Sequence, residues 1–211
     1  MALFQKKPDT SSIKPLYTLG ANKTVLIIGL GNPEQKFDGT RHNIGFAVLD
    51  EFAIQNDFPA WMVKKDLKCH ITSHTMGENR VVLCKPTTYM NNSGEAAQAV
   101  QHFYRVYNAQ MLAVYDELAI PFGQLRTRLG GSDAGHNGVK SLTQHVGDDY
   151  GRLRIGIGNE VAAKADAADF VLGKFTKEEQ GKLPEIIKEA GVLITEYIFS
   201  GELSAQTRSV L

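Results

Sequence analysis

The segment TVLIIGL, residues 24–30, is an almost unbroken run of β-branched and aliphatic residues. A continuous apolar run of this length, without alternating polar positions, is typical of a strand that is buried on both faces. Such strands occur in sheets that carry helices on both sides. This one segment therefore restricts the chain to an α/β architecture with a central sheet.

Strand and helix patterns interleave along the rest of the chain. Further strands are predicted at residues 67–75, 80–84, 111–115, 124–128 and 152–157. Helices are predicted at residues 45–56, 95–107, 138–146 and 184–200. A capping box at Thr176 and Glu179 also opens a helix, and Gly201 ends one. The turn at 76–79 joins two strands as a hairpin, so the sheet should be mixed.

We therefore predict an α/β fold: a single domain over residues 24–211, with a central mixed β-sheet and helices on both faces. Residues 1–23 are predicted to be a flexible N-terminal extension. They lack the long apolar core of a secretory signal, and the longest apolar run near them is too short to cross a bilayer. We expect a soluble protein of the cytoplasm.

Charge and cysteine content limit the function only loosely. The 23 basic and 23 acidic side chains cancel, which gives no general attraction to nucleic acid but leaves room for a local basic patch. Cys69 and Cys84 have no metal-type spacing. We expect two buried thiols in a reducing compartment, although one disulfide is conceivable.

The residues after the first strand, GLGNPE, begin like a dinucleotide-binding fingerprint. The third glycine position holds Glu34, and Pro33 removes a backbone donor that a pyrophosphate would need. We therefore do not expect a nicotinamide or flavin cofactor. Asn32 remains notable, because it places an amide at the carboxyl end of a buried strand, where open α/β sheets usually bind ligands.

Other strand exits and loops also carry polar residues. Asp116 follows the predicted strand 111–115, and His42 lies in the segment GTRHNIGF. A histidine oriented by a carboxylate can deprotonate water, and asparagine amides can hold the water, the scissile carbonyl and the oxyanion. The other loops of this kind carry the polar residues Asn91, His136 and Asn137, and the apolar Met90 precedes Asn91.

The absence of two catalytic motifs from the sequence limits the type of reaction that we expect. The sequence contains neither a GxSxG nucleophile elbow nor an HExxH zinc motif. The pattern favours hydrolysis of an activated acyl group by water, without a covalent intermediate and without a metal. Taken singly, however, each asparagine could be a turn or helix N-cap residue, and the aspartate could be a turn former.

Two pairs of arginines have the spacing of a strand face. Arg126 and Arg128 lie two residues apart on one predicted strand, as do Arg152 and Arg154 on another. The pairs could form a clamp for phosphate, which the planar guanidinium binds well. They could also be a solvated strand face with ordinary ion pairs, which is our expectation for Arg126 and Arg152.

These motifs together resemble the bacterial-type peptidyl-tRNA hydrolase family, in the family's order and from residue 25 onward. The matching segments are GLGNP (29–33), TRHNIGF (40–46), KPTTYMNNSG (85–94), YDELAIPFG (115–123), GHNGVKSL (135–142), RLRIGIGN (152–159) and FVLGKF (170–175). The resemblance implies a three-layer fold and cleavage of the ester between a peptide and the 3′-terminal ribose of tRNA. It also implies a monomer with no cofactor and no obligate protein partner.

Residue roles follow from the same resemblance. It implies that His42 is the general base, that Asp116 orients it, and that Asn32 positions His42 and the scissile group. Arg128 and Arg154 would clamp the 5′ phosphate of the acceptor stem. The residues implied to bind the substrate and the CCA end are Phe37, Tyr89, Met90, Asn91, His136 and Asn137.

The chain departs from the family pattern at four positions: Glu34, Phe37, Ala119 and Asp133. These departures affect contacts to the tRNA end and the glycine-rich loop at 130–135, while the catalytic matches are kept. Two other functions compete with ester cleavage on tRNA. One is a non-catalytic RNA-binding protein, and the other is an esterase or amidase for small N-acyl substrates.

Overall fold

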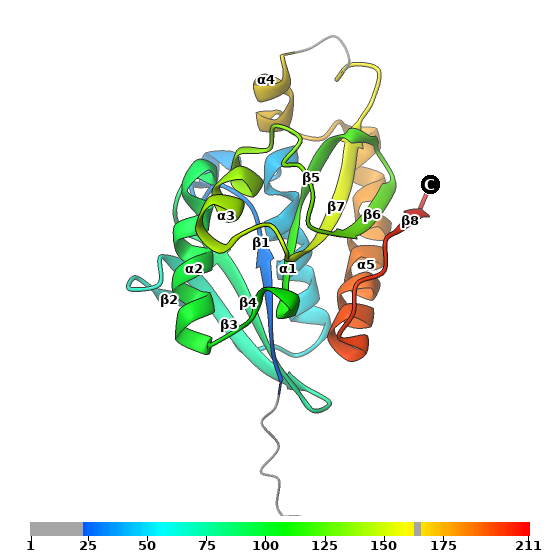
Figure 1. Cartoon of the computed structure of the whole chain (residues 1–211). Helices are drawn as coiled ribbons and strands as arrows, with labels where there is room; N and C mark the ends of the chain where they lie inside the picture. Colours follow the sequence, from blue (N-terminus) through cyan, green and yellow to red (C-terminus); the bar gives the residue numbers. More distant parts are fainter. Residues whose placement is uncertain (1–22, 163–165) are drawn as a thin grey trace, which may run out of the picture.

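The computed structural model describes residues 23–162 and 166–211, which form one sheet with helices around it (Figure 1). The predicted extension, residues 1–23, lies outside the described residues except for Lys23. The strands are β1 (Thr24–Gly29), β2 (Met62–Lys64), β3 (Cys69–Met76), β4 (Asn79–Pro86), β5 (Met111–Pro121), β6 (Gln124–Leu129), β7 (Gly151–Gly158) and β8 (Gln206–Ser209). The helices are α1 (Ile44–Gln55), α2 (Ser93–Tyr104), α3 (Asn137–Val146), α4 (Ala167–Leu172) and α5 (Lys177–Ser200).

The sheet is mixed, with the strand order β2-β3-β4-β1-β5-β7-β6-β8. β1 lies parallel to β4 and β5, and β5 lies parallel to β7. The outer strands pair in antiparallel fashion, including the predicted hairpin of β3 and β4. Because the four central strands run the same way, their carboxyl ends meet at one edge of the sheet. This arrangement confirms the predicted mixed sheet.

The apolar run in β1 is explained by a core on each side of the sheet. Val25 and Ile27 belong to the core that α1 and α5 cover, whereas Leu26 and Ile28 belong to the core under α2 and α3. Neighbouring side chains of a strand point to opposite faces, so a strand covered on both sides needs apolar residues at every position. The predicted three layers are therefore confirmed.

Some elements differ from the prediction. β2, β8 and α4 were not expected, because three to six residues are too few to show a period. α5 is one continuous helix that contains Pro184, and its first turn carries the predicted capping box between Thr176 and Glu179. β5 extends to Pro121, so Asp116 lies inside the strand and not beyond its end.

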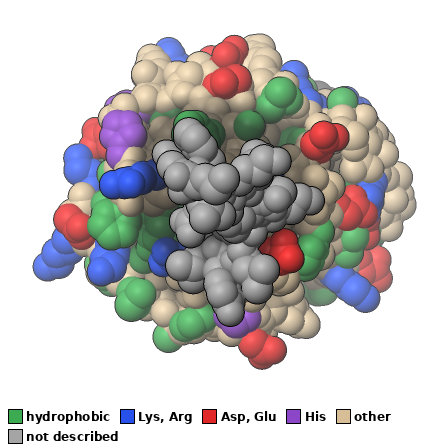
Figure 2. Space-filling view, turned by 60° about the horizontal axis from the view of Figure 1, so that its bottom comes forward, with side chains coloured by type: hydrophobic (Ala, Val, Ile, Leu, Met, Phe, Trp, Pro, Cys, Tyr) green, Lys and Arg blue, Asp and Glu red, His purple; other side chains and the backbone are tan. Residues whose placement is uncertain are grey.

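Both cysteines, Cys69 and Cys84, are buried free thiols, as expected. Figure 2 shows the end of the molecule at which β1 begins, and acidic and basic side chains are interspersed on the visible part of that face. Among the described residues, we find no helix with the length and apolar character that a membrane span requires.

Candidate active site

A cleft of about 750 Å³ opens at the edge of the sheet where the parallel strands end. Every residue that the sequence assigned to the base, its carboxylate partner, the asparagines and the CCA end lines this cleft. They are Asn32, Phe37, His42, Tyr89, Met90, Asn91, Asp116, His136 and Asn137. The sequence did not indicate that α4 forms part of the wall, which it does through Ala167, Ala168, Val171 and Leu172.

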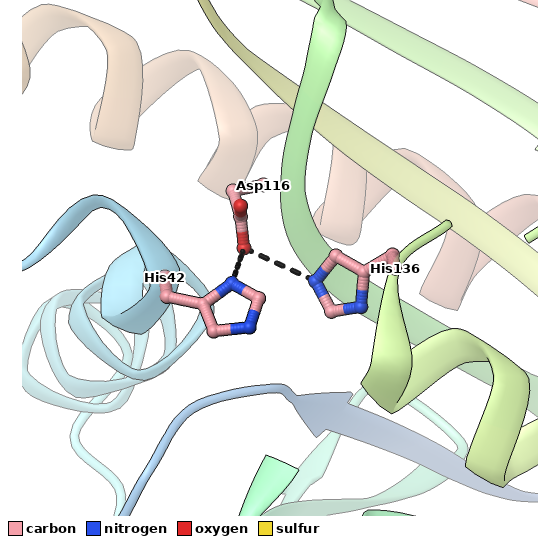
Figure 3. Close-up of side chains that lie close together, drawn as sticks. All are labelled: His42, Asp116 and His136. Carbon is pink, nitrogen blue, oxygen red and sulfur yellow. Dashed lines mark hydrogen bonds and ion pairs between the residues drawn. The ribbon is translucent and has the colours of Figure 1, made fainter. Parts of the chain in front are cut away.

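Asp116 is the centre of a buried cluster at the floor of the cleft (Figure 3). One of its carboxylate oxygens, Oδ1, lies 2.9 Å from Nδ1 of His42 and 3.1 Å from Nε2 of His136. The two histidines approach from opposite sides, with 4.8 Å between their ring centroids. Asp116 is 1% exposed and His42 is 8% exposed. The structure thus brings together the base and the carboxylate predicted from the sequence.

Backbone hydrogen bonds determine which ring nitrogen of His136 carries the proton. Nδ1 of His136 accepts hydrogen bonds from the backbone N–H groups of Gly138 (3.1 Å) and Val139 (3.3 Å) at the start of α3. An acceptor nitrogen in neutral imidazole has no proton, so the proton of His136 is on Nε2. That N–H donates to Asp116, which makes His136 both the N-cap of α3 and a partner of the carboxylate.

His42 uses the opposite ring nitrogen toward the same oxygen. Its Nδ1–H donates to Asp116, which leaves Nε2 as the basic lone pair. Burial favours the neutral form of Asp116, but His136 and His42 outweigh it, through their positive charge when they are protonated and through their hydrogen bonds, and hold the pKa of Asp116 below its usual range. Asp116 is therefore a carboxylate at any working pH, and it can stabilise a proton on His42.

Two close backbone contacts bring His42 to Asp116. A Cβ atom on Gly45 would lie 2.3 Å from the carbonyl oxygen of Val114, and one on Gly29 would lie 2.6 Å from the carbonyl oxygen of Gly45. Only glycine fits at both positions, so the start of α1 packs directly on β1 and β5. His42 lies in the short helix η2 (Arg41–Asn43) immediately before α1. Any larger residue at these glycines would push the histidine away from the carboxylate.

Asn32 is held so that its amide nitrogen is left for the cleft. Its side-chain oxygen accepts a hydrogen bond from the backbone N–H of Met90 (2.9 Å). Asn43 bonds both backbone polar groups of Asn32, each at 2.9 Å. Asn43, in the segment GTRHNIGF, is one of the asparagines that could be turn or helix N-cap residues, so its supporting role was not predicted from the sequence. The side chain of Asn32 bonds Met90, and its implied role in positioning His42 and the scissile group stays a prediction.

The remaining cleft residues stand at the rim. Asn91 is exposed in the short helix η3 (Met90–Asn92), and Asn137 is the exposed first residue of α3. Phe37 is half-buried. The hydroxyl of Tyr89 donates to the carboxylate of Glu34, so this departure from the family pattern contacts a residue of the rim. These side chains present amides and rings to whatever enters the cleft.

His42, Asp116 and His136 also place one potential metal ligand each within 4.8 Å of one another. A metal on Nε2 of neutral His136 would require the proton to move to Nδ1. Two backbone N–H groups already point at that atom, so the proton would face donors in place of an acceptor. The donor set therefore favours the hydrogen-bonded cluster over a metal site.

A comparison with protein families identifies the family of the chain that forms this cleft. The family model described as Peptidyl-tRNA hydrolase matches residues 26–210, which is most of the chain. The chain belongs to the peptidyl-tRNA hydrolase family. Members are ester-bond hydrolases, and the substrate is peptidyl-tRNA. The resemblance seen in the sequence motifs is thereby confirmed.

Individual relatives agree with the family match. The peptidyl-tRNA hydrolase of Gloeobacter violaceus is 44% identical over 163 residues, which are 77% of this chain and 81% of that protein. The peptidyl-tRNA hydrolase of Chlorobaculum parvum is 42% identical over 187 residues, 87% of this chain and 96% of that protein. The crystal structure of the Acinetobacter baumannii peptidyl-tRNA hydrolase has a TM-score of 0.73 at 29% identity, and the match covers 84% of this chain and 92% of that one.

The arginines of this hydrolase lie beside the cleft, on β6 and β7. Arg126 pairs with Arg154 and Arg128 pairs with Arg152 across the two strands, so all four side chains share one face. Burial lowers the pKa of the Arg154 guanidinium, and the nearby charge of Arg128 lowers it further. The expectation of ordinary ion pairs is wrong for Arg126 and Arg152, because neither has a carboxylate partner among the described residues. Arg126 bonds Gln124, and Arg152 is 0% exposed. Its position under α3 could not be deduced from the strand period alone.

Proposed function

We propose that His42 is the general base in the hydrolysis of peptidyl-tRNA. Nε2 of His42 takes a proton from water, and the oxygen of that water attacks the ester carbonyl of the bound substrate. The tetrahedral intermediate then breaks its bond to the 3′ ribose oxygen, which receives the proton back from His42. The products are a free peptide with a carboxyl group and a tRNA with a free 3′-terminal hydroxyl.

The single observation that carries this proposal is the pair of hydrogen bonds at Asp116. Because both histidines donate to one buried carboxylate oxygen, His42 is fixed in the tautomer that has a lone pair on Nε2. The same negative charge stabilises the imidazolium that forms when His42 accepts the proton. General-base catalysis by a positioned histidine contributes roughly 10²–10⁴-fold to a rate.

The asparagines serve the substrate in this proposal. The side-chain oxygen of Asn32 already accepts from Met90, so in this proposal its N–H donors serve the scissile carbonyl and its oxyanion. Asn91 and Asn137 bind the peptide backbone, the attacking water and the tRNA 3′ end. Both are exposed at the rim, where such contacts have to be made.

For the tRNA we propose contacts to the acceptor stem, the CCA end and the 5′ phosphate. Phe37 and Tyr89 offer rings at the mouth of the cleft, where the terminal bases can stack. Arg128 and Arg154 bind the 5′ phosphate. The mutual influence of their charges supports a shared phosphate, because an anion between them would relieve the repulsion. Such contacts carry no base information, which suits an enzyme that serves many tRNAs.

We further propose that residues 24–211 act as a single domain and as a monomer in the cytoplasm. The continuous sheet from β2 to β8 supports one domain. Two buried free thiols are compatible with a reducing compartment, where tRNA is used in translation.

Measurements with an acylated tRNA, a small ester and free tRNA distinguish peptidyl-tRNA hydrolysis from the two competing functions, a general esterase and a non-catalytic RNA-binding protein. We expect cleavage of N-acyl-aminoacyl-tRNA, and little cleavage of a small N-acyl amino acid ester that lacks the tRNA. Equal turnover of both would make the protein a general esterase, and tight tRNA binding without any ester cleavage would make it a binding protein. Either result contradicts the proposal.

A further inference from the structure

The loop between β6 and α3, residues 130–136, connects the arginine cluster to the catalytic cluster. It leaves β6 two residues after Arg128 and ends at His136, whose ring donates to Asp116. Its backbone is left-handed at Gly130, Gly131 and Gly135, and also at Ala134. Glycine adopts such angles as readily as others, so a segment this rich in glycine needs fixed contacts to keep one conformation.

Those contacts come from two arginines that share one acceptor. The carbonyl oxygen of Ser132 accepts from Nη2 of Arg128 at 2.6 Å and from Nη1 of Arg152 at 2.9 Å. A Cβ atom on Gly131 would lie 2.8 Å from Cζ of Arg128, so the loop passes directly against that guanidinium. The position of Ser132 is therefore set by the arginines beneath it.

The two arginines differ in what else they can reach. Arg128 is half-buried and can turn to a phosphate in solvent. Arg152 is fully buried, lies 4.8 Å from the Tyr150 ring centroid, and has a long second bond of 3.4 Å to Oγ1 of Thr143. Burying a guanidinium without an anion is costly unless its donors are used, and Ser132 is the best acceptor that Arg152 has.

From Ser132 the hydrogen bonds continue to the cleft. The side-chain oxygen of Ser132 accepts from the backbone N–H of Ala134 at 3.2 Å. The backbone oxygen of Asp133 accepts from the N–H of His136 at 2.9 Å, and the Asp133 carboxylate accepts from the N–H of Gly135 at 2.8 Å. A shift of Ser132 therefore moves His136 and the neighbouring Asn137.

We infer that Arg152 is a positioning residue for the reaction: through the Ser132 carbonyl it holds the loop that carries His136 and Asn137. When Arg128 binds the substrate's 5′ phosphate, its bond to Ser132 weakens, and Arg152 then holds the loop alone. This inference rests on the proposed function, because it assumes that Arg128 binds phosphate and that His136 supports Asp116. It predicts that Arg152 matters most when the phosphate is present.

The test compares Arg152→Met with wild type on N-acetyl-aminoacyl-tRNA that carries or lacks the 5′ phosphate. We expect kcat of the variant to fall on the order of tenfold with the phosphorylated substrate, since small misplacements of catalytic groups are costly. KM should change much less than kcat, because Arg152 does not itself bind the phosphate. With the dephosphorylated substrate the loss in kcat should be smaller, because Arg128 still holds Ser132. A merely structural residue would lose the same factor with both substrates.

Two other variants complete the design. Arg126→Met removes an arginine from the same face that bonds Gln124 and not the loop, so kcat should match wild type. Arg152→Lys keeps one donor for Ser132 and should restore part of kcat. If Arg152→Met does not fold, hydrogen exchange of the amides of residues 133–137 in Arg152→Lys replaces it, and faster exchange than in wild type is expected.

Three results would overturn the inference. A higher KM with unchanged kcat and a weaker salt dependence would make Arg152 a phosphate ligand. An equal loss of kcat with both substrates would make Arg152 a structural residue. Unchanged hydrogen exchange in the loop would mean that the bond from Arg152 to Ser132 does not hold the loop. The exchange measurement needs no turnover, so it stays informative even if His42 proves not to be the base.

Discussion

The catalytic cluster and the arginine cluster are neighbours that differ in how far their polar groups are satisfied. Around Asp116, both histidines have defined partners and only Nε2 of His42 is left for chemistry. On β6 and β7, the Nε atoms of all four arginines are buried without a hydrogen-bond partner. No carboxylate pairs with these arginines among the described residues.

The difference shows which part of each site the protein supplies itself. A preorganised catalytic group must be complete before the substrate arrives, because reorganisation during the reaction raises the barrier. A phosphate site can be incomplete, because the substrate brings the negative charge. The first cluster should therefore control kcat. In the second cluster, Arg128 and Arg154 should control KM and the response to salt, whereas Arg152 should act on kcat through the loop.

The largest expected effect is on the first cluster. His42→Ala removes the base, so kcat should fall by roughly 10²–10⁴-fold while tRNA affinity stays close to wild type. Steady-state kinetics on N-acetyl-aminoacyl-tRNA together with a filter-binding assay separates the two quantities. Near-normal turnover in this variant would remove His42 from the proposed role.

Asp116→Asn tests the partner in the same cluster. The side chain keeps its shape but loses the charge that stabilises a proton on His42, so kcat should fall by roughly 10²-fold. Asp50→Asn is a matched control, because Asp50 forms a half-exposed ion pair with Lys85 away from the cleft floor. Similar kinetics in the two variants would mean that the cluster has no special role.

The second cluster is tested by Arg128→Ala. Losing one phosphate contact should raise KM and flatten the slope of log affinity against log salt by about one unit. kcat at saturating substrate should change far less than in the Asp116 variant, because Arg152 still holds Ser132. If the salt slope matches wild type, Arg128 does not bind phosphate.

These regions were predictable to different degrees from the sequence. The buried strand at 24–30 could be predicted from that segment alone, because a strand with apolar residues at every position must be covered on both sides. Asn32 and Asp116 were found because they follow predicted strands, and His42 was found because it lies in a motif that resembles the family's. All of these signals are local along the chain.

The features that could not be predicted from the sequence depend on tertiary contacts. Period two placed Arg152 on a strand face, but only the packing of α3 and the loop at 130–136 shows that it is buried. The second bond of Asp116, to His136, depends on a helix start that lies 20 residues away. α4 is six residues long, too short for any period to reveal.

The smallest predicted effect concerns stability in acid. The pKa of Asp116 is lower in the folded protein than its unfolded value of about 3.9, so its carboxylate stabilises the fold above that pH. This contribution is lost as the pH falls through the folded pKa. Urea unfolding of wild type and Asp116→Asn should give free energies that converge as the pH falls below about 4. A gap that does not depend on pH would mean that the charge of Asp116 does not stabilise the fold.

The most direct test is the protonation state of the two histidines in the resting enzyme. Nitrogen-15 NMR of the imidazole rings distinguishes the neutral tautomers. We expect the proton on Nδ1 for His42 and on Nε2 for His136, with both resonances changed in Asp116→Asn. A neutral His42 with its proton on Nε2 would have no lone pair for water, and that result would contradict the proposed mechanism.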